Sequence, residues 1–221
     1  MLPEPLLSAL LLVFITAIIA AAIAGLGTVL WIVLQLAAAP GVVVHEFAHA
    51  IACRLIGVRI HEVVYFRFGE PAGYVRHEQP ERYHNAFVIG VAPFLVNTVV
   101  AFGALLAFAD LVTTTGIVTP SNGVFPAVDP GAASRELLVG AVALAWLGLA
   151  IGVHAFPSTG DANALWAQTR TRWRRSPLVL LGIPFVLVVY VVSLLSWLWA
   201  DVLYAIGLLL LAFAVVGSPL V

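Results

Sequence analysis

Apolar runs longer than a membrane is thick constrain this chain more than any other feature. The first run extends from Leu6 to Ala39, about 50 Å of α-helix at about 1.5 Å per residue, which exceeds one bilayer crossing. Of the 221 residues, 62% are hydrophobic and 10% are charged, too apolar a composition for an ordinary soluble domain. Because backbone polar groups in lipid must be paired within each segment, these runs are expected to be helices. The sequence therefore predicts an all-α polytopic membrane protein.

We expect about six transmembrane helices in a single domain that covers residues 1–221. The predicted spans are 6–24, 28–56, 84–109 and 135–155, followed by two spans within 177–217 that turn near 197–201. The first two spans could also be one continuous tilted helix, but Gly25 to Gly27 favours a break, and Pro40 predicts a kink in the second helix. The last two spans form a predicted C-terminal helical hairpin at about residues 176–217.

The segments between the spans have a different character. From Gly57 to Arg82, β-favouring residues flank the turn sequence Gly69-Glu-Pro-Ala-Gly73, which predicts a small β-hairpin at the membrane face. Residues 110–133 are rich in Thr, Pro, Gly, Ser and Asn and are expected to form a polar loop. Residues 161–175 combine helical spacing with tryptophan and arginine anchors, which is typical of a short interfacial helix.

Arginine supplies all ten basic residues, and their distribution predicts an orientation. Five arginines lie at the end of the second predicted span or after it, and four separate the fourth span from the fifth, whereas the opposite loop carries only Arg135. By the positive-inside rule the arginine-rich side faces the cytoplasm, and we expect the protein to lie in the cell membrane. The same distribution suggests no nucleic-acid partner, so the lipid bilayer is the expected environment.

The residues His45-Glu46-Phe47-Ala48-His49 place two imidazoles and a carboxylate inside the second span. Positions i and i+4 lie on one helix face, so His45 and His49 can bind one metal ion while Glu46 lies beside it. Zinc would act as a Lewis acid and lower the pKa of a water molecule, and the carboxylate would take its proton. The alternative is hydrogen bonding between helices, but ionisable residues inside a span are costly and usually mark a functional site.

A zinc site that leaves one position open for chemistry needs a third protein ligand. The single cysteine, Cys53, excludes a cysteine-rich site and is expected to be a packing residue. We favour Asp161, which follows a Pro-Ser-Thr-Gly break on the predicted cytoplasmic side, although an aspartate there could instead cap a helix. His154 is the rival ligand, and it could also polarise the carbonyl under attack or bond to a neighbouring helix. Asn97 is expected either to contact an oxyanion or substrate, or to join two helices.

These residues resemble the site-2 protease family of intramembrane zinc metalloproteases. The resemblance covers about residues 40–165 and rests on His45 to Ala50 with Arg54 and Gly57-Val58, on Phe68-Gly69, on Gly90 to Asn97, and on Pro157 with Asp161. It implies that His45, His49 and Asp161 bind Zn²⁺, that Glu46 is the general base, and that Asn97 contacts substrate or intermediate.

The second motif of that family departs from its usual form here. It usually reads Asn-x-x-Pro-x-Pro-x-x-Asp-Gly, whereas this chain has His154 in place of the Asn, no second Pro, a shorter spacing, and Ala162 after Asp161. The resemblance therefore implies a divergent branch, with a catalytic core at about residues 28–165.

The resemblance implies hydrolysis of peptide bonds in membrane-spanning substrates near the cytoplasmic face. A substrate helix would unwind and add as a strand to the hairpin edge around residues 60–75, and His154 or Asn97 would steady the oxyanion. The alternative function is a metal-binding membrane transporter or sensor without proteolytic activity. A transport path should carry polar residues on both sides of the site, whereas here they concentrate on one side.

Overall fold

The computed structural model describes residues 3–119, 127–172, 183–184, 187–188, 190–191 and 199–217. The chain divides into two compact units, Met1–Ala37 and Ala38–Val221. The described part of the first unit is helical from Glu4 onward. The second unit contains the remaining helices, both small sheets and the metal-ligand candidates, and the rest of the description concerns this unit.

The first helix, α1 (Glu4–Leu55), is uninterrupted over 52 residues and contains Pro40. The break predicted at Gly25 to Gly27 is therefore wrong, and 6–24 and 28–56 are not separate helices. Each glycine costs a helix only about 1 kcal/mol, whereas a turn within an apolar run would leave several backbone groups unpaired in lipid. The continuous helix is the less costly arrangement.

Among the described residues, three helices are long and apolar enough to cross a membrane. They are the stretch Leu10–Leu55 of α1, the helix α2 (Tyr83–Thr114) and the helix α3 (Arg135–Val153). A fourth apolar helix, α6 (Ala200–Val216), has 17 residues. The prediction of about six spans is thus not supported, although the first arm of the predicted C-terminal hairpin falls largely outside the described residues.

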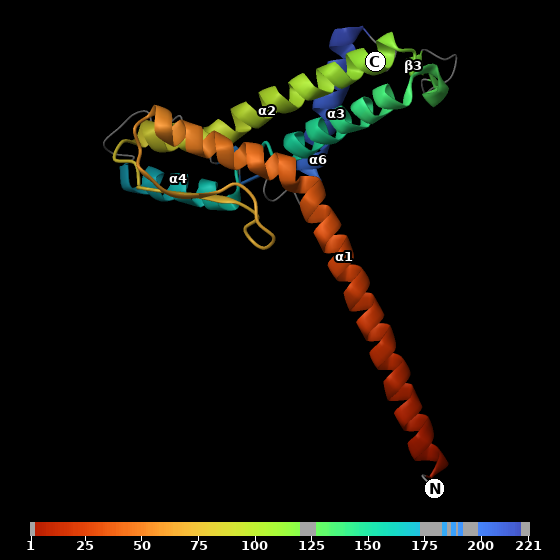
Figure 1. The fold of residues 1–221 in the computed structure, drawn as a ribbon. Helices are drawn as coiled ribbons and strands as arrows, with labels where there is room; N and C mark the ends of the chain where they lie inside the picture. The colour runs from red at the N-terminus through yellow and green to blue at the C-terminus, as the bar shows by residue number, and fades with distance from the viewer. Residues whose placement is uncertain are drawn as a thin grey trace. The chain divides into compact units, whose positions relative to one another are not determined.

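Helices α2, α3 and α6 pack around a shared apolar core (Figure 1). Small residues line much of it, including Ala101 and Ala109 of α2 and Ala212 of α6, all fully buried. Short side chains allow helix backbones to approach closely, which provides the van der Waals contact that associates helices in lipid.

The β-hairpin predicted within 57–82 is present. Strands β1 (Ile60–Val64) and β2 (Tyr74–His77) are antiparallel, with Val64 opposite Tyr74. The polar loop predicted for 110–133 is shorter than expected because α2 continues to Thr114. It contains the paired strands β3 (Val118–Thr119) and β4 (Ala127–Val128), followed by the 3-10 helix η1 (Pro130–Ala132).

The short helix predicted for 161–175 is α4 (Thr159–Arg172), which begins two residues earlier than expected. It packs against the first turns of α2, where Leu165 contacts Tyr83 and Ala86. The buried hydroxyls of Tyr83 and Thr169 lie 3.1 Å apart and share a hydrogen bond. These contacts hold α4, whose first turn carries Asp161, against α2.

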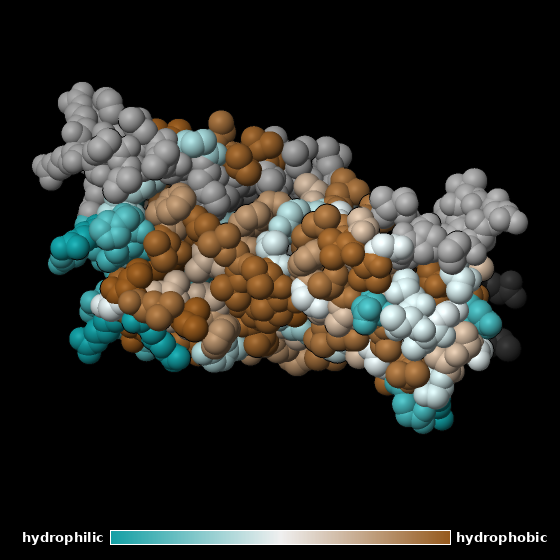
Figure 2. Space-filling model, turned by 90° about the horizontal axis from the view of Figure 1, so that it is seen from above, coloured by the Kyte–Doolittle hydropathy of each residue, from teal (hydrophilic) through white to brown (hydrophobic). Residues whose placement is uncertain are grey.

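The surface of this unit is consistent with a membrane environment. On the face shown in Figure 2, apolar side chains cover the middle and hydrophilic side chains gather at the two ends. Exposed apolar residues of this unit include Leu95 and Val99 of α2 and Val142 of α3. An apolar band between polar ends is the pattern expected where lipid surrounds a helical protein.

Gly41 allows α1 to pass close to the end of α3, and it provides a test of this packing. A Cβ at this position would overlap the carbonyl oxygen of Ala150 and the ring of His154, whereas a Cβ on Gly103 of α2 would meet nothing within 4 Å. We expect Gly41→Ala to destabilise the protein by about 1–3 kcal/mol, as overpacking does. Gly103→Ala should be neutral or stabilising by up to about 1 kcal/mol. Thermal unfolding of both variants in the same detergent measures the difference, and equal melting temperatures would contradict this packing.

Candidate metal centre

His45 and His49 lie on one buried face of α1, as the spacing of the motif predicts. Their side chains are 11% and 8% exposed, and the ring centroids are 5.0 Å apart. Since residues four apart on a helix lie one above the other, the backbone of α1 alone brings the two imidazoles together.

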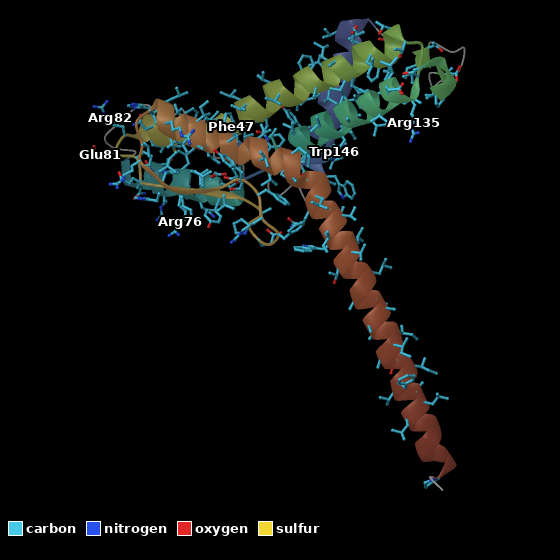
Figure 3. All side chains as sticks on the ribbon, viewed as in Figure 1. Phe47, Arg76, Glu81, Arg82, Arg135 and Trp146 are labelled. Atoms are coloured by element: carbon cyan, nitrogen blue, oxygen red, sulfur yellow. The ribbon has the colours of Figure 1, made fainter. Side chains whose placement is uncertain are left out.

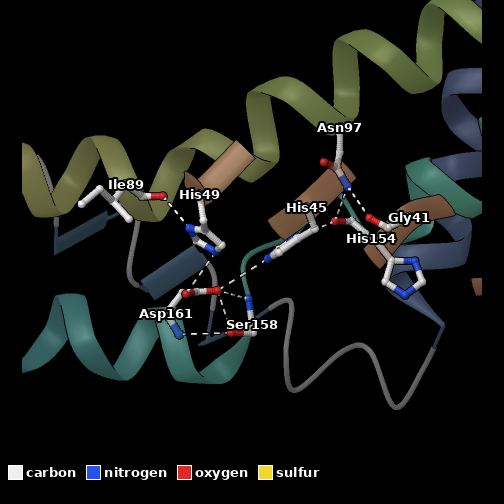
Figure 4. Close-up of polar contacts among 8 residues, drawn as sticks. All are labelled: Gly41, His45, His49, Ile89, Asn97, His154, Ser158 and Asp161. Atoms are coloured by element: carbon white, nitrogen blue, oxygen red, sulfur yellow. Dashed lines mark hydrogen bonds and ion pairs between the residues drawn. The ribbon is translucent and has the colours of Figure 1, made fainter. Parts of the chain in front are cut away.

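Asp161 meets both imidazoles from α4 (Figure 4). Its Oδ2 lies 3.7 Å from His45 Nε2 and its Oδ1 lies 3.3 Å from His49 Nε2. Two ligand atoms of a tetrahedral zinc, each bound at about 2.0–2.1 Å, are separated by about 3.3–3.4 Å. The three candidate ligand atoms lie within 4.8 Å of one another, so the side chains fit a zinc ion with small adjustments. The structure thus brings together the three ligands expected from the sequence.

The other nitrogen of each imidazole is held by a backbone carbonyl group. His45 Nδ1 lies 2.9 Å from the carbonyl oxygen of His154, and His49 Nδ1 lies 3.1 Å from that of Ile89. A carbonyl oxygen can only accept, so both Nδ1 atoms donate. When a metal ion replaces the proton that Nε2 shares with Asp161, each neutral ring presents its Nε2 lone pair to the metal. Two lone pairs and a carboxylate that converge in this way are the donor set of a cation site.

Ser158 holds the carboxylate of Asp161 in place. The hydroxyl and the backbone N–H of Ser158 donate to Asp161 Oδ2 at 2.6 Å and 2.9 Å, and the N–H of Asp161 donates to Ser158 Oγ at 3.2 Å. This reciprocal pairing at the beginning of α4 is a capping box. Ser158 is therefore the N-cap residue, and the carboxylate of Asp161 both closes the capping box and faces the histidines.

The environment of Asp161 favours its charged form. Burial alone would raise the pKa of this carboxyl group, but hydrogen bonds from His45 and His49, the charge of His49 and the hydrogen bonding with Ser158 hold the pKa well below its usual range. Asp161 is thus a carboxylate over the physiological pH range, as a metal ligand must be.

Glu46 lies next to the two histidines on α1 and is 9% exposed. The hairpin approaches it closely: a Cβ on Gly73 would lie 2.7 Å from Glu46 Cγ and 2.9 Å from Val42 Cγ1. The absence of a side chain at Gly73 therefore lets the hairpin pack directly against the side chain of Glu46.

Asn97 and His154 lie beside the metal-ligand candidates, and their contacts are to backbone groups. The fully buried amide of Asn97 donates to the carbonyl oxygen of His154 at 2.9 Å. The imidazole Nδ1 of His154 donates to Ala150 at 2.9 Å, and Figure 4 shows this ring on the side away from Asp161. The group that includes His45, His49 and Asp161 thus does not include the rival ligand His154. A substrate or oxyanion contact by either residue stays a prediction.

Cys53 is a packing residue, as expected, because it is fully buried against Ala52 and Ile89. Sequence reasoning missed Ser158 and the carbonyl of Ile89. The pattern Ser-x-x-Asp at 158–161 is a capping-box signature that would have identified Ser158. The contact of Ile89 involves only its backbone, so its side chain carried no signal.

Comparison with known proteins agrees with this geometry. A family model described as "Putative zincin peptidase" matches residues 38–129. Zincins are zinc metallopeptidases with the pattern H-E-x-x-H, and the matched range contains His45, Glu46 and His49 but ends before Asp161. The match indicates a zinc metallopeptidase and implies zinc as the cofactor of the possible metal-binding group. No curated protein and no solved structure matches the chain.

Ser158→Ala tests whether the capping box also supports the metal ligand. Ser134 at the beginning of α3 provides a matched control, because its hydroxyl also caps a helix, accepting from Leu137 N–H at 3.4 Å. Each alanine substitution should cost about 1 kcal/mol of stability. Only Ser158→Ala should also weaken zinc binding, by about 10–100-fold, since it frees the carboxylate of Asp161. Zinc competition with a chelator measures the difference, and equal affinities in the two variants would exclude this role for Ser158.

Proposed function

We propose that this protein is an intramembrane zinc metalloprotease that hydrolyses peptide bonds of membrane-spanning substrates near the cytoplasmic face. The observation that carries the proposal is the approach of Asp161 from α4 to His45 and His49, which lie with Glu46 on α1, a helix apolar enough to cross a membrane. A metallopeptidase site in such a helix can act on substrates that are themselves embedded in lipid.

Within this proposal, the protein is a divergent relative of the site-2 proteases. The support is the order of elements along the chain: an H-E-x-x-H motif in an apolar helix, a β-hairpin, a second apolar helix with Asn97, and an aspartate that follows the third apolar helix. The zincin match over residues 38–129 supports the metallopeptidase chemistry of this assignment.

The proposed chemistry divides between the metal and Glu46. A zinc ion held by His45, His49 and Asp161 would supply a Lewis acid and lower the pKa of a water molecule. Glu46 then takes the proton of the attacking water as it adds to the scissile carbonyl carbon, and delivers that proton to the leaving amide nitrogen. The C–N bond breaks, and the products are a carboxylic acid and an amine.

The hairpin is the proposed platform for the substrate. Strands β1 and β2 form a two-stranded sheet, so each has an outer edge with backbone groups available to an added strand. The contact of Gly73 with Glu46 brings this sheet to the base. A substrate strand on the hairpin edge would therefore lie close to the catalytic carboxylate.

The arginines support a cytoplasmic position for the site. Figure 3 shows Arg76, Glu81 and Arg82 at the end of the unit where the hairpin and α4 lie, and Arg135 at the opposite end. By the positive-inside rule, the end with the hairpin and Asp161 faces the cytoplasm.

The competing function is metal transport or sensing by the same ligands. A transport path would need polar side chains that continue from the site along several helices. In the described residues, the buried polar side chains are His45, Glu46, His49, Asn97, Gln168 and Thr169, which belong to the site, its immediate surroundings and α4. This concentration favours hydrolysis at a fixed site.

Glu46→Gln and Asp161→Ala separate the roles of base and ligand. We expect Glu46→Gln to lose about 10²–10⁴-fold in cleavage of a membrane-embedded peptide, because it removes the general base, and to retain zinc. Asp161→Ala should lose zinc as well as activity. The measurements are metal content and cleavage for both variants and the wild type. Wild-type protein that binds zinc but cleaves no membrane peptide would favour the transporter or sensor instead.

Cysteine labelling tests the proposed orientation. Arg82→Cys and Arg135→Cys place exposed thiols at opposite ends of the unit, whereas the native Cys53 is buried and serves as the unreactive background. With a membrane-impermeant maleimide applied to intact cells, we expect Arg135→Cys to react and Arg82→Cys to react only after the membrane is opened. The reverse pattern would place the site on the outer side.

A further inference from the structure

One face of α2 carries a proline and an asparagine beside the histidines of α1. Pro93 and Asn97 are four residues apart, so they lie on the same face of the helix, and both side chains are fully buried. His45 and His49 on α1 have the same spacing. Pro93 is linked to His49, and Asn97 to His45, in each case through a backbone carbonyl group.

Pro93 is connected to His49 through the carbonyl group of Ile89. In a regular α-helix the carbonyl of residue 89 accepts a hydrogen bond from the N–H of residue 93. Proline has no N–H, so this carbonyl lacks its helical donor. In the structure the Ile89 oxygen accepts from His49 Nδ1 at 3.1 Å. The proline thus makes a carbonyl in the middle of a helix available to a side chain of the neighbouring helix.

Asn97 is connected to His45 through the carbonyl group of His154. That oxygen lies just past the end of α3, and it accepts both from His45 Nδ1 and from Asn97 Nδ2, each at 2.9 Å. The same amide group lies 3.3 Å from the oxygen of Gly41 and 3.4 Å from that of Ile151. Asn97 therefore joins α1, α2 and the end of α3 at the carbonyl that orients His45 (Figure 4).

We propose that Pro93 and Asn97 are positioning residues of the metal site, which orient His49 and His45 respectively through the backbone carbonyls of Ile89 and His154. The proposal rests on the zinc site of the proposed function but not on proteolysis. Fixing Nδ1 as the donor in both rings leaves both Nε2 lone pairs available to the metal without any reorientation on binding.

A packing role alone has different consequences. If Pro93 only fills space, Pro93→Ala should change the stability of the metal-free protein, through lost packing contacts and a restored helical hydrogen bond, and should leave zinc affinity unchanged. In our proposal the restored N–H competes with His49 for the Ile89 carbonyl. The same substitution then weakens zinc binding, and this loss of zinc affinity, which a packing role does not predict, distinguishes the two roles.

The experiment measures three properties: zinc affinity, the visible spectrum of the Co²⁺-loaded protein and the thermal stability of the metal-free protein. The variants are Pro93→Ala, Asn97→Leu and the double variant, with Thr98→Val as the control. Thr98 adjoins Asn97 on α2, and its hydroxyl lies 2.8 Å from Tyr204 Oη, so Thr98→Val removes a neighbouring helix-to-helix hydrogen bond that does not reach the histidines. We expect about 10–100-fold weaker zinc binding and an altered Co²⁺ spectrum in each of the first two variants. The double variant should bind zinc more weakly than either single variant, because the two substitutions act on different histidines.

Thr98→Val should keep the affinity and spectrum of the wild type. If Asn97→Leu does not fold, Pro93→Ala decides alone, since the change favours the helix. Wild-type affinity and spectrum in Pro93→Ala, or an equal loss in Thr98→Val, would overturn the proposal. Wild-type protein that does not bind zinc would overturn the site and this inference together, whereas zinc binding without cleavage would remove only the protease assignment.

Discussion

The hydrogen bonds from His45 Nδ1 and His49 Nδ1 to backbone carbonyls are the interactions on which the rest of the site depends. In an apolar helix bundle an unpaired ring N–H is costly, and a ring free to exchange its two nitrogens would not present a fixed lone pair. Both carbonyls come from places where a helix cannot use them, one opposite a proline and one past a helix end. The same features that interrupt regular helix bonding therefore make two oriented metal ligands possible.

Helix α2 connects the helices that build the site. It packs with α3 and α6 through the main apolar core, and its first turns hold α4 through the hydrogen bond of Tyr83 with Thr169. Through α4 it sets the approach of Asp161, whose carboxylate is fixed further by Ser158. The site is thus assembled between α1, α2 and α4, and the hairpin reaches it because Gly73 carries no side chain.

Much of the site was predictable because it depends on local spacing and on the chemistry of single residues. The pair His45 and His49 followed from helical periodicity, and Asp161 from the need for a third ligand on the same side. The hairpin followed from β-favouring residues on both sides of a turn. The continuity of α1 was not predicted, since two glycines suggest a turn in isolation, whereas lipid makes backbone hydrogen bonding the stronger requirement.

The sequence by itself determined that the chain is apolar enough for a membrane, that one helix face carries two imidazoles and a carboxylate, and that few carboxylates could complete the ligand set. Only the tertiary structure decided which of these came together and how they were oriented. It directed the ring of His154 away from Asp161 while its carbonyl oxygen accepts from His45, and it paired the carbonyl of Ile89 with His49. The physical reason is that side-chain patterns encode faces and periods, whereas backbone carbonyls are identical at every residue and acquire a role only when another helix packs against them.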